Sequence, residues 1–268
     1  MIINSNHKQT IVFTITVIGL SFLVFWGPVA LLKLRTANLV EGRIYNIPAF
    51  ILFFIGGFVP SLTGLALTMI YEGKPGLKNL LRSAINLKIR SNIYIIIFLY
   101  PVIIGTFQVI IYSLTGGSID FFQFIKQLPT ILPLLLLGPL SEEFGWRGFL
   151  QKRINDSFSP ITGSIIIGLT WSLWHLPLFF MIGTSQHDFN MPFIPFMISV
   201  VSTSFAYTYI YFRSNGSLSA AILFHWTGTY ILQVIASQVS RTPVYNWLES
   251  LPALATGFVF IILLKKQK

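Results

Sequence analysis

Long apolar stretches separated by short polar segments run through this chain from end to end. A membrane-spanning helix needs about 20 mostly apolar residues, and eight stretches have this length and character. They are residues 10–32, 47–71, 93–114, 121–149, 161–182, 192–212, 217–237 and 247–264. The pattern predicts an all-α, polytopic membrane protein of about eight transmembrane helices, with residues 1–268 forming a single membrane-embedded domain.

The fourth stretch is unlike the others because Pro129, Pro133 and Pro139 interrupt it. Each proline removes a backbone donor and tends to kink or end a helix. We therefore expect a short helix, a break, and a second helix that carries Glu142 and Glu143.

The charge content supports the membrane class. Only 10% of residues are charged, against about 25% in soluble domains, which argues against a soluble domain with one anchor. The chain has no cysteine, so disulfides and thiolate metal sites are excluded. The first apolar stretch is longer than the roughly 7–15 residues of a signal-peptide core, so we expect an uncleaved first helix.

The net charge of +10 comes from basic residues that lie between the apolar stretches. A nucleic-acid partner is therefore not expected, and the lipid bilayer is the expected surroundings. Eight spans put both termini on one side, together with 13 of the 18 Lys and Arg residues. The other five are Lys33, Arg35, Arg43, Lys126 and Arg241. This bias predicts that both termini are cytoplasmic in a multi-pass protein of the cell membrane. The most basic connection, residues 72–92, fits this bias better than a dedicated lipid-headgroup site.

Charged residues cluster at the end of the fourth apolar stretch. Ionisable groups inside a membrane cost about 2.5–3.5 kcal/mol each on insertion scales, so they indicate function by default. On a helix, Glu143 and Arg147 share one face and are expected to form an ion pair. Glu142 is rotated by about 100°, so it is expected to point into a cavity and act as a general base. The alternative is a solvated helix end at the membrane surface.

Two of the four histidines, His175 and His225, lie inside predicted spans. Two imidazoles and a carboxylate suit zinc, and the same groups without metal can activate water and stabilise an oxyanion; both possibilities stay open. Thr229 follows His225 by one helical turn, so its hydroxyl can assist there or bond its own backbone. We expect Glu142 and His225 near the cytoplasmic ends of their helices. His175 should lie deeper, unless its helix is tilted or kinked near Pro177.

Three motifs give the chain a family resemblance. They are E-E-x-x-x-R at residues 142–147, aromatic-x-x-x-H at residues 171–175, and H-x-x-x-T at residues 225–229. Over about residues 132–231 the chain resembles the CAAX-protease and bacteriocin-processing family of intramembrane proteases, called CPBP or Abi. That family has Asn where this chain has Thr229, and usually Phe where it has Trp171.

The resemblance implies an eight-helix fold and an endopeptidase that hydrolyses a peptide bond in a membrane-associated protein or peptide, either with zinc or without a metal. Glu142 and His175 would activate water, His225 and Thr229 would stabilise the oxyanion, and Glu143 and Arg147 would brace the site. The metal ligands, if a metal is bound, would be Glu142, His175 and His225. The alternatives are a non-catalytic bacteriocin-immunity or protein-binding factor on the same scaffold and, less favoured, a proton-coupled transporter.

Overall fold

The structure is a computed structural model that describes residues 5–38, 43–120, 136–236, 239 and 241–266. Seven helical stretches in this part of the chain are long and apolar enough to cross a membrane. They are Asn6–Leu31, Ile47–Ile85, Ser91–Leu114, Pro160–Phe180, Phe193–Arg213, Leu218–Ala236 and Pro243–Lys265. The predicted all-α, polytopic fold is confirmed.

The seven stretches correspond to seven of the eight predicted spans. Of the remaining prediction, residues 121–149, the part up to residue 135 lies outside the described residues. The described part continues as one helical segment over residues 137–155, made of α6 (Leu137–Glu143), a π-helix η3 (Phe144–Leu150) and α7 (Gln151–Asn155). This segment carries Glu142 and Glu143, as expected.

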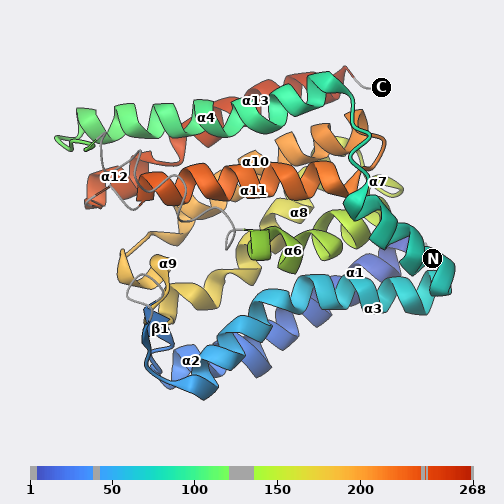
Figure 1. Ribbon diagram of the computed structural model, residues 1–268, viewed down its shortest axis with the longest axis horizontal. Helices are drawn as coiled ribbons and strands as arrows, with labels where there is room; N and C mark the ends of the chain where they lie inside the picture. The colour runs from blue at the N-terminus through green and yellow to red at the C-terminus, as the bar shows by residue number, and fades with distance from the viewer. Residues whose placement is uncertain (1–4, 39–42, 121–135, 237–238, 240, 267–268) are drawn as a thin grey trace.

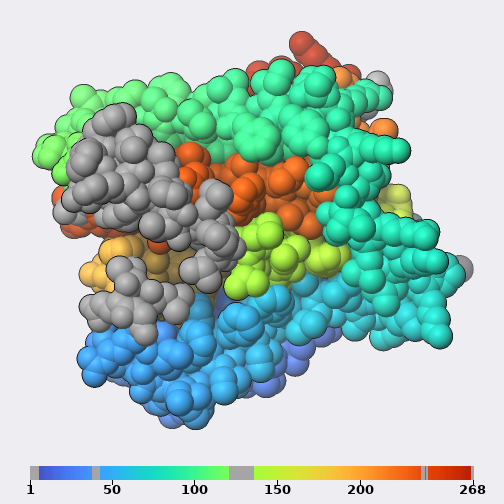
Figure 2. Space-filling view, viewed as in Figure 1, coloured from blue at the N-terminus to red at the C-terminus, as the bar shows by residue number. Residues whose placement is uncertain are grey.

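The helices lie roughly parallel to one long axis and form layers (Figure 1). The first layer contains α1 (Ser5–Leu20), π-helix η1 (Ser21–Phe25), α2 (Trp26–Leu31) and α3 (Ile47–Ile85). Next come residues 137–155 and α8 (Pro160–Trp174), then α10 (Phe193–Arg213) and α11 (Leu218–Ala236). The outer layer is α4 (Ser91–Leu114) with α13 (Leu251–Lys265). In the space-filling view, α6 reaches the surface between α11 and α3 (Figure 2).

Short elements close one end of the bundle. They are the antiparallel pair β1 (Ala37–Asn38) and β2 (Arg43–Ile44), the 3-10 helix η4 (Leu176–Phe180), α9 (Ser185–Asp188) and α12 (Pro243–Leu248). Both termini of the described chain lie at the other end (Figure 1). This agrees with an even number of crossings; the cytoplasmic side of the termini stays a prediction.

Proline and a capping side chain start several helices. Asn46, Ser159 and Thr242 each accept a hydrogen bond from the backbone N–H three residues on, at 2.9, 3.2 and 3.2 Å. A proline follows within the first turn in all three cases, where its missing N–H costs nothing. These caps fix where α3, α8 and α12 begin.

The basic segment after the second span differs from the prediction. Residues 72–92 were expected to be a polar connection, but the helix α3 extends to Ile85. It breaks at Gly73, whose φ of 67° and ψ of −168° are non-helical, a conformation that only glycine adopts at low cost. The break lies next to the predicted end of the span at Tyr71, and the part of α3 beyond it turns along the edge of the bundle (Figure 1).

Candidate active site

The acidic motif lies on a deeply packed part of the fold. Glu142, Glu143 and Arg147 are 8%, 0% and 1% exposed, so the alternative of a solvated helix end is wrong. The segment approaches α3 backbone to backbone, because a Cβ on Gly145 would lie only 2.2 Å from the carbonyl oxygen of Pro60. Small residues at such crossings let membrane helices pack closely. Gly145 therefore allows the segment that carries Glu142 and Glu143 to pack directly against α3.

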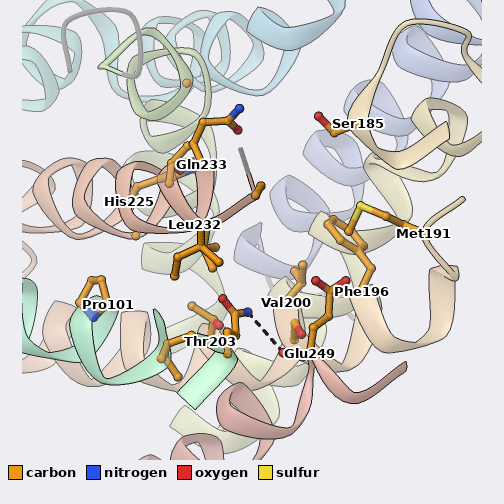
Figure 3. Close-up of a pocket in the computed structure, with 18 of the residues that line it drawn as sticks. Pro101, Ser185, Met191, Phe196, Val200, Thr203, His225, Leu232, Gln233 and Glu249 are labelled. Atoms are coloured by element: carbon orange, nitrogen blue, oxygen red, sulfur yellow. Dashed lines mark hydrogen bonds between the residues drawn. The ribbon is translucent and has the colours of Figure 1, made fainter. Parts of the chain in front are cut away.

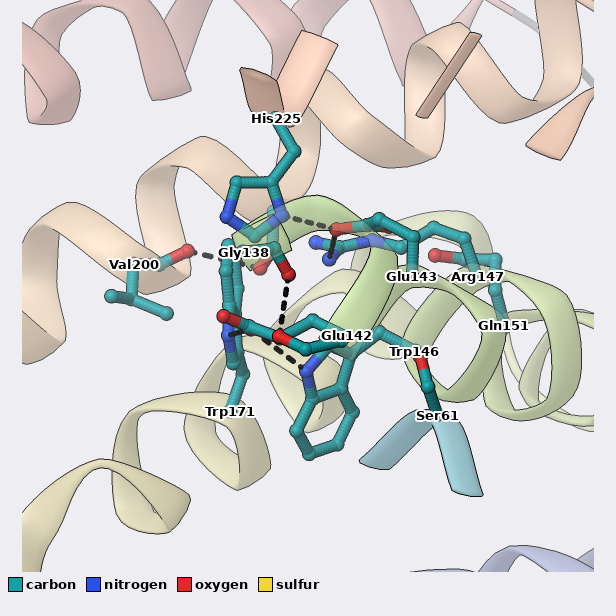
Figure 4. A network of polar contacts seen from close by, with 12 residues as sticks. Ser61, Gly138, Glu142, Glu143, Trp146, Arg147, Gln151, Trp171, Val200 and His225 are labelled. Atoms are coloured by element: carbon teal, nitrogen blue, oxygen red, sulfur yellow. Dashed lines mark hydrogen bonds and ion pairs between the residues drawn. The ribbon is translucent and has the colours of Figure 1, made fainter. Parts of the chain in front are cut away.

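Glu143 and Arg147 form the predicted ion pair. Arg147 Nη1 donates to Glu143 Oε1 at 2.9 Å, and both side chains are fully buried. The guanidinium carbon lies 3.6 Å from the ring centre of Tyr207 and 4.5 Å from that of Trp171, so two aromatic rings stabilise the cation. The same carboxylate oxygen of Glu143 lies 2.7 Å from His225 Nδ1 (Figure 4). Glu143 therefore links Arg147 to His225.

Glu142 is held by neutral donors instead. Its Oε2 accepts hydrogen bonds from Trp146 Nε1 at 3.2 Å and Trp171 Nε1 at 2.6 Å (Figure 4). Trp146 follows Glu142 by four residues, just as Arg147 follows Glu143, so consecutive residues of η3 hold consecutive carboxylates. Within the described part of the chain, both hydrogen bonds to the Glu142 side chain go to the same oxygen, Oε2. The other oxygen is left for a group in the adjoining cavity.

His175 lies at the C-terminal end of α8, where the helix gives way to η4. Its Nδ1 lies 2.9 Å from the carbonyl oxygen of Trp171. A carbonyl only accepts, so Nδ1 carries the proton. The neutral ring then has its lone pair on Nε2. Aromatic rings surround the imidazole, with ring centroids of Trp174 at 4.5 Å and Phe196 at 5.2 Å.

His225 is oriented by a carboxylate. Nδ1 lies 2.7 Å from Glu143 Oε1, so Nδ1 donates to the carboxylate and Nε2 is the ring's remaining polar atom. Thr229, one turn further along α11, lines the same cavity as His225. The part of the chain that the structure describes shows no hydrogen bond from the Thr229 hydroxyl, including none to its own backbone. The hydroxyl is thus a free donor for a molecule in the cavity.

One cavity of about 440 Å³ joins the predicted residues. Glu142, Trp171, His175, His225 and Thr229 all line it. Residues of α4, α10, α11, the α12 region, and α9 with the segment after it form most of the rest of its wall, as Figure 3 shows for part of the lining. Most of this wall is apolar, with Pro101, Leu232, Val200 and Phe196 among the labelled residues. The sequence-predicted groups therefore meet at one largely apolar cavity.

The depth at which these residues lie corrects one expectation. Glu142 was expected near the cytoplasmic end of its helix, but the helical segment continues to Asn155, about 13 residues or roughly 20 Å further. His175 lies about 15 residues, or roughly 22 Å, after Pro160 at the start of α8. Because the chain reverses between Asn155 and Pro160, Glu142 and His175 lie at similar depth. α8 also gives way to η4 just before Pro177, close to where a kink was one of the alternatives considered.

The zinc prediction was tested against the donor geometry. Among the described residues, no group of three His, Cys, Asp or Glu side chains is arranged to hold a metal ion. Glu142, His175 and His225 line one cavity, but the described residues do not bring three such donors together in this arrangement. The zinc site therefore stays a prediction that metal analysis can test.

Three functional contacts were missed from the sequence. Trp146 could have been found, because an indole four residues after Glu142 shares its helix face. The bond from Trp171 to Glu142 joins α8 to α6, and Tyr207 reaches Arg147 from α10. Both depend on tertiary packing, which no local spacing encodes.

Comparison with known proteins agrees with this geometry. Residues 124–231 match the family model of the type II CAAX prenyl endopeptidase Rce1-like proteins. The chain is also 30% identical over 161 residues to a protein of Methanococcus maripaludis named CAAX prenyl protease 2. The resemblance to the CAAX-protease family is confirmed. The matched residues contain the three motifs found in the sequence, with Thr229 at the position of the family's asparagine. The alignment with the archaeal relative covers 56% of this chain and 59% of that protein's length.

Proposed function

We propose that this chain is an intramembrane endopeptidase of the CAAX-protease type, which hydrolyses a peptide bond in a membrane-associated protein or peptide. The observation that carries the proposal is the single cavity lined by Glu142, His175 and His225. A carboxylate, two imidazoles and a free hydroxyl facing an apolar cavity are the groups that peptide hydrolysis by activated water requires.

Glu142 acts as the general base. Two indole N–H groups fix its Oε2, so its free oxygen takes a proton from a water molecule as that water attacks the carbonyl carbon. The protonated Glu142 then passes this proton to the leaving amine as the carbon–nitrogen bond breaks. His175, with its Nε2 lone pair directed by the bond from Nδ1 to Trp171, accepts a hydrogen bond from the same water and orients it.

The oxyanion of the tetrahedral intermediate meets His225 and Thr229. Glu143 stabilises the imidazolium form of His225 through the 2.7 Å contact, and its Nε2–H then donates to the oxyanion. Arg147 balances the charge of Glu143 through the 2.9 Å ion pair. The Thr229 hydroxyl supplies the second donor in place of the family's asparagine. A lost oxyanion donor costs about 10²–10³ in rate, so this threonine is a sensitive position.

The test is cleavage of membrane-associated peptides by purified protein in detergent. Glu142→Gln, His175→Ala and His225→Ala should each lower kcat by at least about 10². Arg35→Gln, which changes an exposed residue outside the cavity, should retain activity. Unchanged activity in the three cluster variants would refute the proposal. Full cellular function of Glu142→Gln would instead favour the non-catalytic immunity factor. Zinc content measured on the same preparations tests the metal prediction directly.

A further inference from the structure

The cavity contains a second charged group that the proposed reaction does not use. Arg241 and Glu249 both line it. Arg241 Nη1 lies 2.9 and 2.8 Å from the two carboxylate oxygens of Glu249. The two side chains are only 10% and 12% exposed. Among the described lining residues, Arg241 is the single Lys or Arg. A buried charge of this kind inside an apolar wall indicates a function.

Arg241 is anchored through one nitrogen only. Besides Glu249, Nη1 donates to Asn246 Oδ1 at 3.2 Å. Nε is buried, and among the described residues neither Nε nor Nη2 has a hydrogen-bond partner. Nε and Nη2 form the side edge of the guanidinium, with two parallel N–H groups. That edge is the one with which arginine binds a carboxylate in a bidentate manner.

Glu249 and Asn246, which hold Arg241, are themselves hydrogen-bonded to other parts of the fold. Gln108 of α4 donates from Nε2 to the Glu249 carbonyl at 3.3 Å. Asn246 of α12 donates from Nδ2 to the Phe189 carbonyl, after α9, at 3.1 Å. The orientation of Arg241 is therefore fixed before any ligand arrives, which reduces the entropy cost of binding.

The length of helix α11 gives the distance between Arg241 and the reaction centre. His225, Thr229, Leu232 and Ala236 line the cavity along one face of the helix. From His225 to Ala236 the helix rises roughly 17 Å, and an extended peptide of about five residues spans the same length. Arg241 follows Ala236 at that end of the cavity.

We propose that Arg241 binds a carboxylate of the substrate polypeptide, about five residues or fewer from the bond that Glu142 acts on. The carboxylate is either the free C-terminus of the chain or an acidic side chain, and both offer the same two oxygens to the free edge of the guanidinium. Arg241 is then a specificity-determining residue. This inference rests on the proposed peptidase function for its orientation along the cavity, but its test reads binding alone.

The experiment measures peptide binding to the Glu142→Gln protein, so that turnover plays no part. The probes are fluorescein-labelled, apolar octapeptides of Ala and Leu in detergent, in three forms: a free C-terminal carboxylate, a C-terminal amide, and the amide with one Asp near the end. We expect one carboxylate-bearing form to bind roughly 10- to 100-fold more tightly than the plain amide. Which form gains affinity tells the C-terminus from a side chain.

Arg241→Gln should abolish this preference without changing the affinity for the plain amide. Because that change leaves Glu249 buried without its partner, the double variant Arg241→Gln, Glu249→Gln keeps the test valid if the single variant unfolds. The matched control is Arg35→Gln, at the same end of the bundle but outside the cavity, which should keep the full preference. Equal binding of the three peptides, no binding of any, or a preference that survives in the double variant would overturn the proposal. Loss of peptide cleavage alone would count only against the proposed function.

Discussion

At the scale of single residues, Trp171 connects the groups of the candidate site. Its indole N–H donates to Glu142, and its carbonyl accepts from His175. Its ring lies edge-on to His225, with centroids 5.6 Å apart, and over Arg147. In the sequence, this tryptophan only marks the aromatic position of a motif. The ion pair of Glu143 and Arg147 was predictable because one helix contains both partners, whereas the contacts of Trp171 need three helices in place.

Replacing Trp171 by Phe separates the indole hydrogen bond from the packing of the ring. The variant keeps an aromatic ring between His225 and Arg147 but removes the 2.6 Å bond to Glu142. Hydrogen bonds to charged groups contribute about 1.5–3 kcal/mol, so we expect kcat to fall roughly 10- to 100-fold, with little change in thermal stability.

Trp174→Phe is the matched control. Trp174 is also buried on α8, and its Nε1 donates to Ser21 Oγ at 2.8 Å instead of to a carboxylate. Its loss should leave kcat close to that of the wild type. An equal fall in both variants would show that Trp171 acts through packing and would contradict its role in holding Glu142.

At the scale of elements, hydropathy predicted the spans well, and side-chain chemistry decided their details. Seven of the eight predicted spans correspond to helices. In a bilayer, a single apolar segment can satisfy all of its backbone hydrogen bonds only as a helix. The prediction failed for residues 72–92, where polar composition suggested a connection and a helix formed beyond Gly73. The π-helical turn η3 was also not foreseen, since an i,i+4 pair such as Glu143 and Arg147 fits both α and π geometry.

The close crossing of η3 and α3 gives the prediction that belongs to this scale. A methyl group on Gly145 would lie 2.2 Å from the Pro60 carbonyl oxygen and 2.5 Å from its carbon. Backbone atoms cannot move aside as a flexible side chain can, so Gly145→Ala must push the two elements apart. We expect a destabilisation of about 1–3 kcal/mol, seen as a lower midpoint of thermal unfolding in detergent. Activity should fall as well, because Glu142 and Glu143 move with η3.

Gly57→Ala is the control on α3 itself. A methyl group there would meet nothing within 4 Å, and replacing a helical glycine by alanine is worth about 0.5–1 kcal/mol in the favourable direction. Its unfolding midpoint should be equal to or above that of the wild type. If Gly145→Ala were as stable as Gly57→Ala, the crossing would be looser than its geometry indicates.

At the scale of the whole molecule, the two ends of the bundle differ in charge. One end carries both termini (Figure 1) and eleven of the described basic residues: Lys8, Lys74, Lys78, Arg82, Lys88, Arg90, Lys152, Arg153, Arg213, Lys265 and Lys266. The other end carries Lys33, Arg35, Arg43 and Arg241. The order of the spans in the sequence predicted how the basic residues divide between the two ends. The fold confirms that the helices share one long axis, so that the bundle has two distinct ends. The positive-inside rule therefore predicts that the first end faces the cytoplasm.

The absence of cysteine makes this orientation directly measurable. The chain contains none, so a single introduced thiol is the only site for a maleimide. Lys78→Cys and Ser185→Cys place exposed thiols at the basic end and at the opposite end. In intact cells, a membrane-impermeant maleimide should label Ser185→Cys at once and Lys78→Cys only after the membrane is permeabilised. The unsubstituted protein should give no signal. The reverse pattern would place both termini outside the cell. The cavity residue Ser185 would then face the cytoplasm, and a substrate would have to enter the cavity from the cytoplasmic side.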